Sequence, residues 1–411
     1  MGYSIPPVNS IQYADTAQLD AFNRLRVSSP TAQLDAQFTY DLQPLLMEPI
    51  TNGSGATVTH DTTNRNALMT FSSTPTGGKA YMQTYEWFRY QAGKSKECLI
   101  SFNFIEAIAN TLKFAGIGDG TNGFEVQQSG STIQLVLYSG STNGNQTVTQ
   151  ANWNIDGMNP SLNSKNPSGV TLDFTKTQLL VLDFQALYVG RARMGFNVGG
   201  ITYYVHQFNH ANLIAYPYIQ NANLPIRAGM TCTGTVSTTM RFICCSVLSE
   251  GGVEDVSAYS QTAEGSATAG NNTFVHLLSI RPKTTFNSIT NRIKFLYLDL
   301  DFSVTGANNI YWQLCIGQAI SGTTTYTDVN STYSAYEYNT AGTISGTPTL
   351  VIDSGYVAGA KSSGNAIIMS KYPITLDAAG AVRALGTLTL IVRGEGGASA
   401  CKGSLKWDEI R

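Results

Sequence analysis

LYLDLDF, residues 296–302, alternates between two sets of side chains at every position. In an extended strand, successive side chains point to opposite faces of the sheet. Leu296, Leu298, Leu300 and Phe302 would share one face, and Tyr297, Asp299 and Asp301 the other. The stretch therefore predicts a β-strand that buries its leucine face in a hydrophobic core.

The same character extends along the chain. Strand-like runs include TIQLVLYSG (132–140), QLLVLDF (178–184) and TLTLIVRG (387–394), with Gly-, Ser- and Asn-rich turns between runs. Strands recur about every ten residues, the spacing typical of sandwiches and jelly rolls. Helical periodicity is almost absent, so we expect an all-β fold.

Length and composition suggest how this fold is divided. A chain of 411 residues is too long for one ordinary domain. Residues 249–272 contain few bulky apolar side chains, and the first residues contain paired prolines that favour extended chain. We therefore expect two β-sandwich (jelly-roll-like) domains behind an extended arm: the arm over 1–44, the sandwiches over 45–250 and 273–411, and a linker over 251–272.

The charge content excludes one large class of partners. Charged residues make up 13% of the chain, with 25 basic against 27 acidic groups and a net charge of −2. Nucleic-acid binding draws most of its affinity from basic side chains on phosphates, so no nucleic-acid partner is expected. No apolar run approaches the ~18 residues of a membrane span, so no membrane insertion is expected. A surface rich in Thr, Asn and Gly suits proteins that pack in many copies.

The six cysteines indicate the environment in which the chain folds. Cys98, Cys232, Cys244, Cys245, Cys315 and Cys401 form no CxxC pair and have no metal-ligand spacing. Buried cysteine often serves as a small core residue. We expect reduced thiols and folding in a reducing cytoplasm.

The hexapeptide TAQLDA occurs twice, at 16–21 and 31–36. A repeat architecture needs at least three stacked copies, so we expect two different roles. The first copy leads into AFNRLRVSSP, and the second leads into an apparent strand. In the extended part of the first, Leu25 and Val27 would face one way and Arg24 and Arg26 the other.

This first segment resembles a known motif. DAFNRLRVSSP (20–30) is similar to the DAFGRLRVS-type N-terminal motif of a family of tailed-bacteriophage virion structural proteins, with Asn23 where that family usually has glycine. Five further blocks continue the resemblance in order: TYEWFRYQAGKSKECLISFNF (84–104, Ala92 in place of proline), VGRARMGFNVGGITYYVHQFNHAN (189–212), NLPIRAGM (223–230), LSIRPKTTFNSITNR (278–292) and GSLKWDEIR (403–411).

The resemblance implies a virion structural protein, made in the bacterial host cytoplasm, that serves as a decoration, fibre or connector. No catalytic set of residues is identified in the sequence, so no enzymatic activity is expected. It also implies a symmetric oligomer, most plausibly a homotrimer, that docks on other virion proteins. We expect the arm to dock by burying Phe22, Leu25 and Val27 in a groove of a partner or of the chain's own first sandwich. Arg24 and Arg26 would then pair with carboxylates or carbonyls.

Two alternatives remain open. A host-surface adhesin would bind glycans through aromatic residues, and the best aromatic cluster is Trp87 with Tyr85, Phe88 and Tyr90. Alternation divides this cluster between two faces, which favours core packing. A polysaccharide depolymerase would use Asp299 and Asp301, about 6.5 Å apart along a strand. A solvated strand surface is the simpler interpretation.

No cofactor or metal is expected. His206 and His210 share a strand face but would lie about 13 Å apart, too far to ligate one ion. They are expected to make hydrogen bonds instead. Asp119 in GIGDGTNGFE (116–125) lacks the alternating ligands of a calcium loop, and a tight hairpin explains its glycines.

Overall fold

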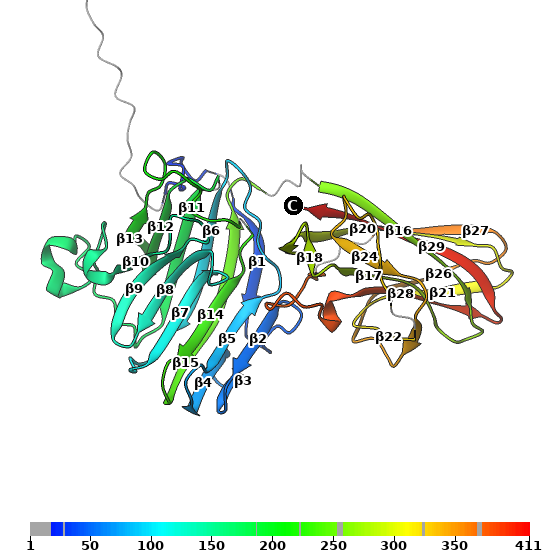
Figure 1. The fold of residues 1–411 in the computed structure, drawn as a ribbon, viewed down its shortest axis with the longest axis horizontal. Coiled ribbons are helices and arrows are strands. Elements are labelled where there is room, and N and C mark those ends of the chain that lie inside the picture. The colour runs from blue at the N-terminus through cyan, green and yellow to red at the C-terminus, as the bar shows by residue number, and fades with distance from the viewer. Residues whose placement is uncertain are drawn as a thin grey trace, which may run out of the picture. The chain divides into compact units, whose positions relative to one another are not determined.

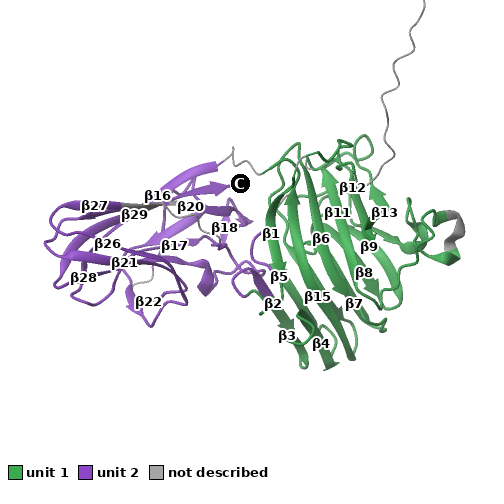
Figure 2. Ribbon diagram, turned by 180° about the vertical axis from the view of Figure 1, so that it is seen from behind, with its two compact units in different colours: residues 1–43, 49–83, 88–254 green, residues 44–48, 84–87, 255–411 purple. Residues whose placement is uncertain are grey.

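The computed structural model describes residues 18–27, 29–185, 187–221, 223–252, 258–322, 325–367 and 372–411. These residues form two compact units, coloured separately in Figure 2. Unit 1 contains the described parts of 1–43, 49–83 and 88–254, and unit 2 those of 44–48, 84–87 and 255–411. Each unit is a β-sandwich, which confirms the expected all-β class with two sandwiches.

Unit 1 pairs an eight-stranded with a seven-stranded antiparallel sheet (Figure 1). The first runs in the order β13-β12-β11-β6-β15-β4-β3, and β1 pairs with the end of β15. Its strands are β1 (Thr31–Gln37), β3 (Ala56–Asp61), β4 (Asn66–Thr74), β6 (Ser95–Asn103), β11 (Gln178–Gln185), β12 (Ala192–Val198), β13 (Ile201–Phe208) and β15 (Val236–Ser249). The second runs in the order β10 (Gln146–Thr149), β9 (Thr132–Tyr138), β8 (Gly123–Ser129), β7 (Thr111–Gly118), β14 (Ile226–Cys232), β5 (Lys79–Thr84) and β2 (Met47–Asn52).

The unit 1 core lies between these sheets, where alternate side chains of facing strands meet. The rings of Phe184 on β11 and Phe124 on β8 lie 5.2 Å apart between centroids. Leu180 and Leu182 share the inward face of β11 with Phe184, and all three are at most 1% exposed. Asp183 points to the opposite, outer face of the eight-stranded sheet. That outer face is where the N-terminal segment lies.

The expected arm over 1–44 is wrong for residues 31–37. They form β1, which pairs antiparallel with Cys244–Ser249 of β15. Leu34, Ala36 and Phe38 are at most 8% exposed and belong to the core. By pairing with β15, β1 completes the eight-stranded sheet, because this edge of β15 would otherwise have unpaired backbone groups. The proline-rich residues 1–17 and Ser28 lie outside the described part of the chain.

Unit 2 is a smaller sandwich of a four-stranded and a six-stranded sheet. The first runs in the order β16 (Ala258–Ala269), β29 (Ser399–Ile410), β20 (Lys294–Val304) and β27 (Ser362–Ile367). The second runs in the order β23 (Thr327–Asp328), β24 (Tyr336–Asn339), β17 (Val275–Pro282), β28 (Leu388–Glu395), β21 (Asn309–Ile316) and β26 (Leu350–Val357). Two ribbons accompany them, β18 (Thr285–Phe286) with β19 (Ile289–Thr290) and β22 (Ala319–Ser321) with β25 (Thr343–Ser345).

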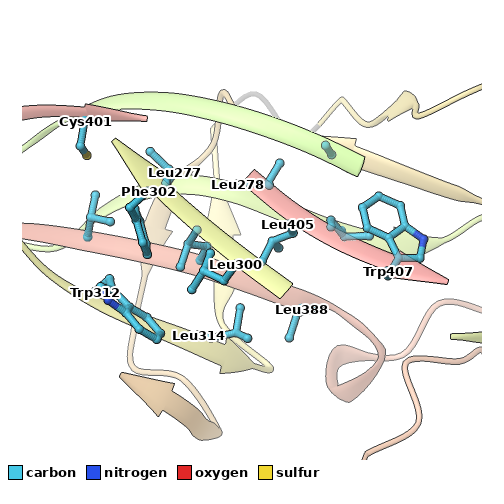
Figure 3. Packing of buried hydrophobic residues seen from close by; sticks show 14 of the residues in the cluster. Leu277, Leu278, Leu300, Phe302, Trp312, Leu314, Leu388, Cys401, Leu405 and Trp407 are labelled. Atoms are coloured by element: carbon cyan, nitrogen blue, oxygen red, sulfur yellow. The ribbon is translucent and has the colours of Figure 1, made fainter. Parts of the chain in front are cut away.

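The LYLDLDF stretch lies in β20 of this sandwich. Leu300 and Phe302 project into the core toward Trp312 and Leu405, as Figure 3 shows. A register shift between Tyr297 and Asp299 interrupts the alternation. Upstream of this irregularity Phe295 is buried, whereas Leu296 is only half-buried. The predicted alternation is therefore confirmed from Asp299 onward and wrong at Leu296.

The expected linker over 251–272 is also wrong over most of its length. Residues 258–269 form β16, which pairs with β29 along all twelve residues. Ala263 and Ala269 are buried in the unit 2 core. The backbone of Gly265 approaches the carbonyl of Leu277 so closely that a Cβ would lie 2.2 Å from that oxygen. Small residues were therefore a sign of close packing, not of a flexible connection.

Helical structure is limited to short 3-10 helices, η1 (Gln150–Asn152), η2 (Pro160–Lys165) and η3 (Ala384–Gly386), within the ranges that the structure describes. None of the helices described there has the length and apolar character needed to cross a membrane. All six cysteines are free thiols, and all but the partly exposed Cys244 are buried. The burial of five of the six agrees with the expected place of these side chains in the core.

Candidate docking site of the N-terminal segment

Residues 18–27 form a tight hairpin. Leu19 and Leu25 are bridged, the Asp20 amide donates to the Arg24 carbonyl at 2.8 Å, and the Asn23 amide donates to the Asp20 carbonyl at 2.9 Å. Asn23 has φ 64°, a left-handed conformation that glycine adopts freely and asparagine tolerates better than most residues. A glycine would also fit this turn, because glycine adopts a positive φ without steric cost.

The hairpin is held to the eight-stranded sheet by its backbone. Leu19 and Ala21 are each 1% exposed. The Ala21 amide donates to Ser95 Oγ at 3.2 Å. The Leu19 carbonyl accepts from Arg193 Nη2 at 2.8 Å, and the Ala21 carbonyl accepts from Gln185 Nε2 at 2.8 Å. Backbone polar groups that packing would otherwise leave unpaired therefore find partners on the sheet.

Asp183 lies at the centre of this contact and is fully buried. Its Oδ1 accepts from Ser95 Oγ at 2.7 Å. Its Oδ2 accepts from Tyr204 Oη at 3.0 Å, from Arg26 Nη2 at 2.9 Å, and from Arg193. A buried carboxylate is tolerated only when charged and polar donors replace water, and here four do so.

Arg26 links Asp183 to two further carboxylates. Its Nη1 lies 2.9 Å from Glu97 Oε1, and its Nε lies 3.0 Å from Glu250 Oε1. Burial lowers the pKa of Arg26, but the surrounding carboxylates together raise it by more than burial lowers it. The net shift of the pKa is therefore upward, and the guanidinium stays charged. Burial also raises the pKa of Glu97 and of Glu250, which Arg26 partly offsets. We call Arg26, Asp183, Arg193, Glu97 and Glu250 the ionic latch.

The latch draws together sequence blocks that lie far apart. The hairpin comes from DAFNRLRVSSP, Ser95 and Glu97 from TYEWFRYQAGKSKECLISFNF, and Arg193 and Tyr204 from VGRARMGFNVGGITYYVHQFNHAN. Lys96 Nζ, in the second block, donates to the carbonyls of Phe88 and Arg89 in the same block. Three of the six resembling blocks therefore meet at one contact.

The predicted docking residues divide between two sides of the hairpin. Arg26 points inward into the latch, while Arg24 pairs with Asp20 inside the hairpin at 2.7 Å and keeps a side chain that is 56% exposed. Phe22 is half-buried, and Leu25 and Val27 are 47% and 88% exposed. Burial of Leu25 and Val27 in a groove of the chain's own sandwich is therefore excluded, because both side chains face outward.

Sequence reasoning missed most of the latch. Asp183 stands alone as a charge in the apolar run QLLVLDF, and that isolation was the available signal. Arg193 and Glu97 likewise lie within strands, where their pairing depends on register between strands. Glu250 follows the last residue of β15. None of these partners is close to Arg26 in the chain.

The remaining candidate residues have local roles. His206 Nδ1 accepts from the Asn154 amide at 3.2 Å, and His210 Nδ1 bonds the Gly190 carbonyl at 2.6 Å, as expected for hydrogen-bonding histidines. Asp119 Oδ1 accepts from the Thr121 and Asn122 amides in the β7–β8 hairpin, which confirms the tight turn. Among the described residues, no group of three or more His, Cys, Asp or Glu side chains could hold a metal ion.

The structure also shows where the candidate carboxylates and the candidate aromatic cluster lie. Asp299 and Asp301 lie on the outward face of β20, paired in register with Lys406 and Ser404 of β29. In the aromatic cluster, Trp87, Phe88 and Tyr90 are at most 7% exposed. The guanidinium of Arg383 lies 3.5 Å from the ring centroid of half-buried Tyr85. Tyr85 and Trp87 belong to unit 2, and Phe88 and Tyr90 belong to unit 1. The four residues therefore do not form one exposed aromatic surface within either unit.

No family model and no curated protein matches the chain. Among solved structures, an endo-1,3-beta-glucanase from Streptomyces sioyaensis has 11% identity and a TM-score of 0.39, covering 55% of this chain and 98% of that one. A carbohydrate esterase from Shiga toxin-encoding bacteriophage phi24B has 12% identity and a TM-score of 0.33, covering 54% and 99%. Winged bean acidic lectin has 12% identity and a TM-score of 0.34, covering 54% and 99%. Similarities this distant assign no function.

Proposed function

We propose that this protein is a structural component of a tailed-bacteriophage particle, and that the hairpin of residues 18–27 presents its contact with a neighbouring virion protein. One observation carries the proposal. Three sequence blocks of the resemblance to virion proteins, separated by up to about 170 residues, meet around this hairpin.

The latch and the exposed side chains of the hairpin have different roles in this proposal. Arg26 fixes the hairpin to the sheet through three carboxylates. Leu25 and Val27 then stand outward on a rigid support. A pre-ordered contact loses little conformational entropy when it binds, which favours assembly. Repeated copies on a particle would strengthen a weak single contact through multivalency.

The test is incorporation into particles. A phage that lacks the gene for this protein is propagated on cells supplying the wild-type chain, a Leu25→Asp/Val27→Asp variant, or an Ile289→Asp control. Ile289 is 72% exposed and belongs to unit 2, so its substitution adds a surface charge outside the unit that carries the hairpin. Quantitative mass spectrometry then counts copies per purified particle, and antibody labelling in the electron microscope locates them.

We expect the double variant to fold and to be depleted from particles at least about tenfold, since 1.4 kcal/mol of lost contact free energy is tenfold in affinity. The control should incorporate like the wild type. Absence of the wild-type chain from particles would reject the virion assignment. Normal incorporation of the double variant would reject the hairpin as the contact.

A further inference from the structure

The seven-stranded sheet of unit 1 has one face in the core and one face outside it (strands β10 to β2 in Figure 1). The core face carries side chains that are completely buried: Ala115, Ile117, Val126, Ala228 and Met230. Because side chains alternate along a strand, their neighbours share the outer face. The register places there Tyr81 of β5, Phe114 of β7, Glu125 and Gln127 of β8, Gln134 and Tyr138 of β9, and Arg227 of β14.

The polar members of this outer face form one hydrogen-bonded row. Arg227 Nε lies 2.5 Å from Glu125 Oε1, and Gln127 Nε2 donates to Glu125 Oε2 at 2.8 Å. Gln127 Nε2 also lies 2.7 Å from Tyr138 Oη, and its Oε1 accepts from Gln134 Nε2 at 2.9 Å. Glu125 is fully buried and Gln127 is 2% exposed, although both point away from the core. The row is therefore pre-organised before any ligand arrives.

Two glycines allow this row and its aromatic neighbours to form. Gly116 lies in register between Arg227 and Glu125, and a Cβ there would lie 2.8 Å from Glu125 Cγ. Gly229 lies in register between Tyr81 and Phe114, and a Cβ there would lie 2.1 Å from Tyr81 Cβ. Side chains two strands apart can therefore meet over a glycine floor.

The aromatic rings lie directly beside the polar row. The centroids of Tyr81 and Phe114 are 5.9 Å apart, and the Arg227 guanidinium lies 4.9 Å from the Phe114 centroid. Tyr81, Tyr138 and Arg227 remain partly exposed above the more deeply buried Phe114. The outer face thus combines flat apolar surface with fixed donors and acceptors.

We propose that this outer face binds a neutral oligosaccharide. A pyranose ring has an apolar C–H face that packs on aromatic rings and a rim of hydroxyls that both donate and accept hydrogen bonds. Tyr81 and Tyr138 would contact the sugar rings, and Gln134, Tyr138 and Arg227 would bind hydroxyls. A few fixed polar groups among aromatic side chains is the usual composition of a small-ligand site.

Charge selects the class of saccharide. Glu125 and Arg227 neutralise each other, and the other members of the row are amides and a phenol. The row therefore offers no surplus positive charge to a uronic or sialic acid, nor to a phosphate backbone. Glu125 is the one carboxylate of this row, whereas glycoside hydrolysis by the common mechanisms uses a pair. The site is thus one that binds without cleaving.

The experiment uses the full chain on a printed array of neutral and acidic bacterial and plant oligosaccharides, followed by titration calorimetry with the best neutral binder. Tyr81→Ala and Gln134→Ala test the site, and Tyr216→Ala is the matched control. Tyr216 is a 60% exposed tyrosine of unit 1 that lies outside this sheet. Thermal unfolding verifies that each variant is folded. If Tyr81→Ala does not fold, Gln134→Ala still tests the site.

We expect saturable binding of a neutral oligosaccharide, weakened about tenfold or more by either site variant. The control should bind like the wild type, and no new reducing ends should appear. Absence of saturable binding to every neutral oligosaccharide, or preference for acidic ones, would overturn the proposal, as would site variants that bind normally. Particle incorporation does not enter this assay, so the two proposals can fail separately.

Discussion

Arg26 and Asp183, separated by 157 positions in the chain, lie 2.9 Å apart between Nη2 and Oδ2 on the outer face of the eight-stranded sheet of unit 1. Asp183 is fully buried, and Arg26 keeps 18% of its side chain exposed. This ion pair attaches the hairpin of residues 18–27, which the sequence predicted to be part of an extended arm, to the first sandwich. Its energetic role can be tested directly.

Arg26→Ala should lower the free energy of unfolding of unit 1 by about 3–5 kcal/mol, because it leaves Asp183 buried with fewer charged partners. Arg24→Ala is the matched control, since the Arg24 side chain is 56% exposed and pairs with one carboxylate, and it should cost at most about 1 kcal/mol. Hydrogen exchange in peptides of β6, β11 and β12 measures the change within unit 1. Equal effects of the two variants would show that the latch contributes no more than a surface pair.

Truncation separates the hairpin from what precedes it. A chain that begins at residue 18 keeps every latch contact described here, whereas one that begins at residue 28 loses Arg26 and uncovers the surface beneath Leu19 and Ala21. The second should unfold about 10 °C lower if 3–5 kcal/mol is lost, at about 2–4 °C per kcal/mol for a unit of this size. The first should match the full chain. Calorimetry on both truncations checks this, and equal transitions for both would contradict it.

Strand identity could be predicted from sequence, but partners between strands could not. Alternation in residues 299–302 indicated which side chains enter the core. The register shift after Tyr297 depends on how β20 pairs with β29, which no local pattern records. The latch is a stronger case, because Asp183 meets Arg26 only through the register of β11 with β6 and the turn at Asn23.

Buried histidines should make the protein sensitive to mild acid. Burial lowers the pKa of His206 in unit 1 and of His276 in unit 2 from 6.5 to about 4. The unfolded chain therefore takes up these protons first. The stability that each neutral histidine contributes is complete above pH 6.5 and is lost as the pH falls toward 4, by about 3 kcal/mol per site.

His206→Gln isolates this contribution in unit 1. Urea unfolding at several pH values between 7 and 4, followed by hydrogen exchange, should show a shallower loss of stability for β13 in the variant than in the wild type. The His276-dependent loss in unit 2 should remain and serves as the internal control. The same pH slope in β13 of both proteins would contradict the role of His206.

A substitution at Gly265 tests whether close packing of small residues explains why residues 258–269 form a strand and not a linker. A Cβ at this position would lie 2.2 Å from the Leu277 carbonyl oxygen and 3.4 Å from Leu278 Cβ. Gly265→Ala should therefore force β16 away from β17 and destabilise unit 2 by about 1–3 kcal/mol, the usual cost of overpacking. Ser266→Ala, at the exposed neighbouring position of β16, should change stability by at most about 0.5 kcal/mol. Hydrogen exchange in β16, β17 and β29 reports the difference, and two neutral substitutions would mean that the segment does not pack as a strand in solution.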